Sequence, residues 1–110
     1  MRIIDTGITK EILSGDNHPQ LKIGDKLYTV DNRQKTWDKI NEIQSNSEFD
    51  EKEKTNRIYD LALGEEARKE IEEMNLPVEN YTFLTFCVMG AITGEDPKKL
   101  QELARNSKNL

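Results

Sequence analysis

Apolar residues are spread thinly along this chain, with one long exception between Pro77 and Gly94. Apolar positions in that stretch follow one another at steps of 3, 4, 3 and 1, the spacing of one helix face: Tyr81, Leu84, Val88, Ala91 and Ile92. Further apolar side chains widen the face around its sides: Phe83, Phe86, Cys87 and Met89. A helix that is apolar on nearly every side is buried by several neighbours. The pattern therefore predicts a central helix that the rest of the chain surrounds.

Residues 20–30 predict a β-hairpin with a two-residue turn at Gly24-Asp25. This turn would pair Ile23 with Lys26 and Leu21 with Tyr28. The register places four apolar side chains on one face: Leu21, Ile23, Tyr28 and Val30. Because a lone hairpin is only marginally stable in water, we expect this face to lie on helices.

Capping patterns and thin apolar stripes predict further helices between residues 32 and 104. Asp31 followed by Gln34, and Asp50 followed by Glu53, both match a capping box. The first of these helices should run to about Gln44, and its stripe is Trp37, Ile40 and Ile43. The expected fold is thus mainly α, with about four to five amphipathic helices around the central one and a hairpin before them.

Glycine and proline mark the remaining boundaries. Gly64 suits the end of one helix, and Glu65 with Glu66 suits the positive end of the next helix dipole. Asp96 and Pro97 are a good cap and first residue for the last helix. The last stripe is Leu100, Leu103 and Ala104, and residues 105–110 are expected to be a polar tail.

Residues 1–18 fit two structures. Ile8, Ile12 and Leu13 match one turn of helix, with Thr9 as its cap and Gly15 as its stop. The same residues also alternate as a strand would, and the sequence does not choose between the two. With 110 residues, the chain is expected to form a single domain over residues 1–110.

The composition narrows the classes of partner. Hydrophobic residues make up 35% of the chain and charged residues 34%, with a net charge of −5. This charge disfavours nucleic acid and anionic membranes, both of which need clustered Lys and Arg. The start of the chain lacks the apolar core of a signal peptide, and no segment reaches the ~20 apolar residues of a spanning helix. We therefore expect a cytoplasmic location, no nucleic acid partner and no membrane.

No residue pattern suggests catalysis. The only histidine, His18, lies in a polar loop and is expected to be a solvated residue. The only cysteine, Cys87, lies among apolar neighbours, where burial makes a thiol inert. The acidic clusters lack the ligand spacing of a calcium loop. We expect no catalytic site, no metal and no cofactor, and hence no enzyme.

A protein-binding surface is the remaining candidate site. Thin-striped helices can each cover only part of a helix that is apolar on every side, and an uncovered apolar patch marks a partner site. Phe83, Phe86 and Met89 are the candidate protein-binding residues, with ordinary core packing as the alternative. Whether the chain also self-associates stays open.

Several segments together resemble one protein family. They are Leu-Lys-Ile-Gly-Asp-Lys-Leu-Tyr-Thr-Val-Asp-Asn-Arg from residue 21, Trp-Asp-Lys-Ile-Asn-Glu-Ile from residue 37, Leu-Ala-Leu-Gly-Glu-Glu-Ala from residue 61, Asn-Leu-Pro-Val-Glu-Asn-Tyr from residue 75 and Met-Gly-Ala-Ile-Thr-Gly-Glu from residue 89. In the order of these segments and in their residue types, the chain is similar to the small acidic tail assembly chaperones of long-tailed phages and prophages of Gram-positive bacteria. The resemblance covers about residues 20–96.

The resemblance implies a non-enzymatic role in the bacterial host cytoplasm. Such chaperones coat the long, helical, apolar tape measure protein, keep it soluble and help to recruit tail tube subunits. Many are made in two forms, the longer through a ribosomal frameshift. A small acidic regulatory or adaptor domain that binds one protein partner is the alternative function.

Overall fold

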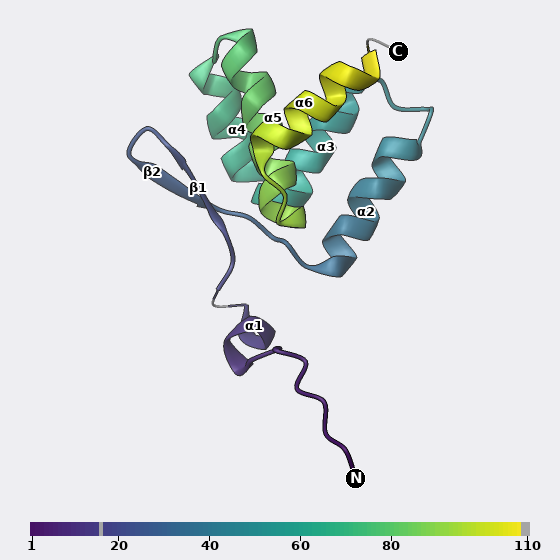
Figure 1. Cartoon of the computed structure of the whole chain (residues 1–110). Coiled ribbons are helices and arrows are strands. Elements are labelled where there is room, and N and C mark those ends of the chain that lie inside the picture. Colours follow the sequence, from purple (N-terminus) through teal and green to yellow (C-terminus); the bar gives the residue numbers. More distant parts are fainter. Residues whose placement is uncertain (16, 109–110) are drawn as a thin grey trace.

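The protein is mainly α-helical, with one two-stranded hairpin ahead of the main helices (Figure 1). The computed structural model describes residues 1–15 and 17–108. Within them the elements follow in the order α1 (Lys10–Ser14), β1 (Gln20–Ile23), β2 (Lys26–Thr29), α2 (Gln34–Ser45), α3 (Glu51–Leu63), α4 (Glu65–Met74), α5 (Val78–Thr93) and α6 (Pro97–Lys108). This confirms the predicted fold class. The Ser14–Pro19 loop was predicted across Asp16, which lies outside the described residues.

The hairpin has the predicted register. Leu21 pairs with Tyr28 and Ile23 with Lys26 across the antiparallel strands. The Val30 N–H donates to the Pro19 carbonyl at 2.9 Å, which extends the pairing by one step. The alternation buries Tyr28 and Val30, while the remaining β2 side chains stay exposed. β1 packs on α5, so the hairpin lies on helices as its apolar face requires.

One apolar core joins β2, α2, α3, α4 and α5. Its buried members come from all of these elements or directly follow them: Val30, Ile40, Ile58, Tyr59, Ala62, Ile71, Leu84, Val88 and Ile92. Trp37 is partly buried against this cluster, as expected of a core anchor. The Tyr59 hydroxyl lies 2.8 Å from Thr85 Oγ1, so the one polar atom of this fully buried ring is satisfied. α3 and α5 each contribute three of these buried residues. α2 and α4 pack on α3, whereas α6 and β1 pack on α5, so the predicted central helix shares the centre of the fold with α3.

The predicted capping box at Asp31 and Gln34 is wrong. α2 begins at Gln34, with Arg33 at the cap position and no side-chain cap bond. The Asp31 carboxylate instead accepts hydrogen bonds from Arg33 Nε at 3.0 Å and from Thr36 Oγ1 at 2.9 Å. The Arg33 guanidinium is the main cause that lowers the Asp31 pKa to about 2. Because Asp31 is engaged with its neighbours and its N–H donates to Ala62 O, it fastens the start of α2 to the end of α3.

Asp50 and Asp96 cap α3 and α6 as predicted, but only the Asp50 half of the predicted capping box at Asp50 and Glu53 forms. Asp50 accepts from the Glu53 N–H at 2.8 Å, and Asp96 accepts from the Lys98 N–H at 2.9 Å. The Glu53 carboxylate binds Arg57 at 3.0 Å. Gly94 ends α5 in the left-handed region, with φ at 83°. These local signals were readable because each acts within one helix turn.

The C-terminal prediction needs correction. α6 continues to Lys108, so the polar tail expected for residues 105–110 is helical as far as residue 108, and residues 109–110 lie outside the described part. Leu103, predicted to be buried, is 63% exposed. α6 packs on α5 alone among the helices that it contacts extensively. One contact face suffices for Leu100 and Ala104, which are half-buried.

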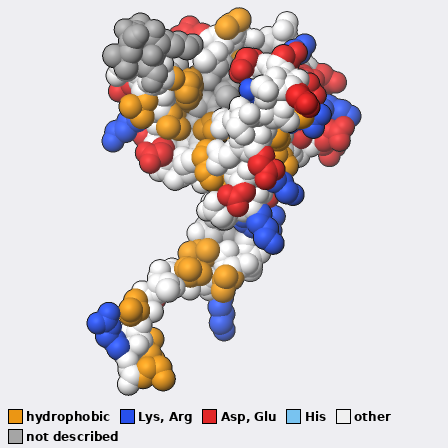
Figure 2. All heavy atoms as spheres, turned by 90° about the vertical axis from the view of Figure 1, so that its right-hand side faces the viewer, with side chains coloured by type: hydrophobic (Ala, Val, Ile, Leu, Met, Phe, Trp, Pro, Cys, Tyr) orange, Lys and Arg blue, Asp and Glu red, His pale blue; other side chains and the backbone are white. Residues whose placement is uncertain are grey.

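Of the two structures possible for the first residues, the helix is the one observed. Thr9 Oγ1 accepts from the Ile12 N–H at 3.3 Å, and Gly15 closes α1 in the left-handed region. α1 has no buried residue. α1 and the residues before it extend away from the helical body (Figures 1 and 2).

His18 is not the solvated residue that the sequence suggested. Its ring is half-buried, and Nδ1 lies 2.9 Å from Asn32 Oδ1. A Cβ on Gly15 would lie 2.9 Å from the ring nitrogen Nε2. The histidine therefore joins the loop before the hairpin to the loop after it.

Candidate functional site

The candidate site lies on α5, the most apolar helix. Phe83, Phe86 and Met89 follow one another at steps of three and all three are half-buried. Met89 packs against the buried core. Phe86 is in a different position, because it lines surface pockets on both of its sides. The three candidates thus have unequal roles, and Phe86 is the central one.

The first pocket beside Phe86 lies where α5 meets α3 and the end of α2. It has a volume of about 410 Å³. Its apolar lining is Ile58, Phe86 and Met89, and its polar lining is Gln44, Glu51, Lys54, Thr55 and Thr85. Lys54 Nζ lies 3.9 Å from Glu51 Oε1, so the two charges on this wall are paired.

The second pocket lies between α5 and α6. Its volume is about 260 Å³, and it is lined by Glu79, Thr82, Phe86, Gln101, Ala104 and Arg105. At the turn that joins these two helices the approach is close, because a Cβ on Gly90 would lie 2.7 Å from the Glu95 carbonyl oxygen. Since Phe86 belongs to both pockets, we treat them as one site and call it the Phe86 groove. Its apolar side chains are Ile58, Phe86, Met89 and Ala104, and the lining of each pocket includes one acid and one base.

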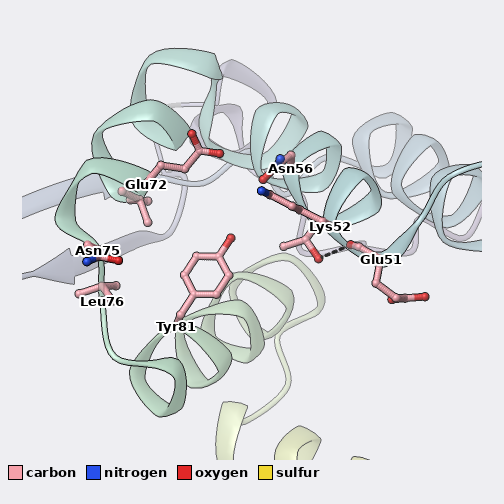
Figure 3. Close-up of a pocket in the computed structure, with 9 residues that line it drawn as sticks. Glu51, Lys52, Asn56, Glu72, Asn75, Leu76 and Tyr81 are labelled. Carbon is pink, nitrogen blue, oxygen red and sulfur yellow. Dashed lines mark hydrogen bonds between the residues drawn. The ribbon is translucent and has the colours of Figure 1, made fainter.

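A third pocket, of about 400 Å³, lies between α3, α4 and the start of α5 (Figure 3). Tyr81 projects into it from α5, between Leu76 on one side and Lys52 on the other (Figure 3). The Tyr81 ring stacks on Tyr59, with centroids 5.6 Å apart. Burial raises the pKa of Tyr81, so its hydroxyl keeps its proton at neutral pH and can donate or accept a hydrogen bond. The pocket can hold a small polar side chain, and its tyrosine is unsuited to act as a base.

Ion pairs link α3 with α4 and the hairpin with α4. The Arg68 guanidinium binds Asp60 on α3 and lies 3.0 Å from Glu72 on its own helix. On the hairpin side, Lys26 Nζ lies 2.8 Å from Glu70. These charges hold elements together across the surface, and each carboxylate has a cationic partner. They are structural contacts and form no convergent reactive group.

The residues expected to be chemically inert have matching surroundings. Cys87 is half-buried, and burial raises the pKa of its thiol, so the nucleophilic thiolate is disfavoured. Among residues 1–15 and 17–108, no group of three or more His, Cys, Asp or Glu side chains is placed to hold a metal ion. None of the helices in that same part of the chain combines the length and apolar character needed to cross a bilayer.

Sequence reasoning singled out Phe86 as a candidate but did not point to the residues that line the pockets beside it. Ile58 and Ala104 belong to helices predicted correctly, yet nothing in their spacing shows that they face Phe86 from opposite sides. The only available signal was that α5 has more apolar faces than its neighbours can cover.

The resemblance to tail assembly chaperones stays a prediction from the sequence. Comparison of the chain with protein-family models, with curated proteins and with solved structures found no match.

Proposed function

We propose that this protein is a non-enzymatic binding domain for an amphipathic helix and serves as a phage tail assembly chaperone. The observation that carries the proposal is Phe86, an aromatic side chain left half-buried at the centre of an apolar groove between α3 and α6. Aromatic side chains in such positions are frequent binding anchors. A client helix binds a groove of this kind through apolar residues at steps of three and four.

The exterior of the domain supports the same function. The net charge is −5, and a third of all residues are charged. A binder with this surface keeps a complex with an apolar client in solution, because like-charged complexes repel one another. The acids and bases that line the groove are equal in number, so the groove does not require a client helix of one particular charge.

The client class comes from the resemblance over about residues 20–96. It points to the tape measure protein, which is long, helical and apolar, and to tail tube subunits as further partners. The site of action would then be the cytoplasm of the bacterial host. A chaperone of this kind needs only reversible binding, which the groove can provide without a reactive group.

The test is co-expression with a tape measure protein as the long, helical, apolar client. We expect the client to be soluble with the wild-type protein and to precipitate with Phe86→Ala. If Phe86 is an anchor, its truncation costs about 2 kcal/mol of binding free energy, which raises the dissociation constant roughly 30-fold. Ala104→Phe should have a similar effect by filling the groove while leaving the core untouched.

Val78→Ala is the matched control. Val78 lies on the same helix, is 84% exposed and lines neither half of the groove. Thermal unfolding of each variant alone confirms that the fold persists. Equal client solubility with and without the wild-type protein would refute the chaperone function. Binding to one folded partner with no effect on the client would favour the adaptor function.

A further inference from the structure

The first thirteen residues form an apolar segment that covers nothing in its own body. We call residues 1–13 the N-terminal arm. Six large apolar side chains on it are each more than half exposed: Met1, Ile3, Ile4, Ile8, Ile12 and Leu13. Single exposed apolar residues are ordinary, but a run of this density on one segment marks an interaction surface. Figure 2 shows hydrophobic side chains along the protruding part of the molecule.

Local hydrogen bonds give the arm a definite shape. Asp5 Oδ1 accepts from the Gly7 N–H at 2.9 Å, and Thr6 Oγ1 accepts from the Ile8 N–H at 3.2 Å. Thr9 then caps α1. These bonds all lie within the arm, so its turns do not depend on contact with the body. A segment that is already shaped loses less conformational entropy when it binds.

The charge distribution favours a second copy as the site where the arm binds. Arg2 and Lys10 balance Asp5 and Glu11, so the arm is neutral in its side chains. The whole net charge of −5 therefore lies on residues 16–110. Two acidic bodies repel when their surfaces meet broadly, whereas a neutral apolar arm can bind an acidic body without that cost.

We infer that the N-terminal arm of one copy binds in the Phe86 groove of a second copy. The groove has the apolar side chains that the isoleucines need, and the lining of each pocket includes one acid and one base, Glu51 and Lys54 in the first and Glu79 and Arg105 in the second. The mixed charges of the arm can meet opposite charges there. A two-fold pair exchanges both arms at once, which buries twice the apolar surface of a single arm. Arm exchange needs no client and goes beyond the function proposed above.

The first experiment measures the mass of the full chain by light scattering from about 1 µM to about 1 mM. We expect the mass to rise with concentration to at least twice that of one chain. Replacing Ile3, Ile4 and Ile8 together by Ser should weaken association about a hundredfold or more. These side chains are exposed, so the folded body should keep its thermal stability. Leu27→Ser with Val78→Ser is the matched control, since both side chains are exposed on the body, and it should associate like the wild type.

The second experiment locates the binding site. A synthetic peptide of residues 1–15 is titrated into the full-length triple Ser variant, and amide NMR shifts are followed. We expect shifts that saturate and cluster at Ile58, Phe86, Met89 and Ala104, and Phe86→Ala should abolish them.

Two results would overturn the inference. One is a chain that stays monomeric at every concentration, or whose association survives the triple substitution. The other is a peptide that shifts residues away from the groove, or that binds only vesicles of phosphatidylglycerol and phosphatidylcholine. Failure of client solubilisation with arm exchange intact would refute the chaperone function alone.

Discussion

Gly90 sits at the closest approach between α5 and the turn that leads into α6. A Cβ at this position would lie 2.7 Å from the Glu95 carbonyl oxygen and 3.1 Å from Pro97 Cγ. The nearest atom belongs to the backbone, so no side-chain rotation can relieve the contact. Gly90→Ala must therefore move the start of α6 away from α5.

Two opposing effects set the size of the change. Alanine in a helix interior is favoured over glycine by about 1 kcal/mol. Inserting a methyl group into a packed contact costs about 1–3 kcal/mol, and the upper part of that range applies where backbone has to shift. We expect Gly90→Ala to lower the free energy of unfolding by about 1–2 kcal/mol. At roughly 4–8 °C per kcal/mol for a small domain, the midpoint of thermal unfolding should fall by about 4–16 °C.

Circular dichroism during urea and thermal unfolding measures this change. Asn80→Ala is the control, because Asn80 is exposed on the same helix and alanine there should raise stability by a few tenths of a kcal/mol. If Gly90→Ala is as stable as the wild type or more so, α5 and α6 do not meet as described. The variant should also weaken client binding, since a displaced α6 carries Ala104 away from the groove.

Two further substitutions test contacts at the edges of the core. Asp31→Asn should cost about 1–2 kcal/mol at pH 7, because the Arg33 guanidinium lowers the Asp31 pKa from 3.8 to about 2 and partial exposure reduces the gain. The ion pair stabilises the wild type above pH 4, and this contribution is lost as the pH falls to about 2. In urea unfolding at low pH, the wild type and Asp31→Asn should therefore have nearly equal free energies of unfolding. A difference as large as that at pH 7 would contradict the ion pair. Tyr59→Phe removes the 2.8 Å bond to Thr85 and should cost about 0.5–1.5 kcal/mol in the same assay. A gain in stability would show that the bond contributes nothing.

Short-range patterns predicted the elements of this fold with good accuracy. The hairpin could be read in full because strand alternation and a glycine turn fix both its register and its buried face. The cap at Asp50 was found because it acts on the next three residues. The cap at Asp31 was misjudged because Arg33, two residues on, competes for the same carboxylate, and spacing does not rank such competitors.

Tertiary features were less predictable. Leu103 has the spacing of a buried stripe, yet it is exposed because nothing described packs on that side of α6. For the candidate site, the apolar excess of α5 identified Phe86. The groove around it depends on how α3 and α6 are placed on either side of α5. A pattern along one helix contains no information on that distance.

The position of the hairpin in the chain has a consequence for synthesis. Its strands end at Thr29, but β1 packs on α5, which is complete only at Thr93. On the ribosome the apolar face of the hairpin therefore lacks the helix on which it packs until more than sixty further residues are made, roughly 3–13 s at ordinary elongation rates. During that interval α2, α3 and α4 can pack on one another as chain neighbours. The hairpin joins last, although it is made before any helix of the body.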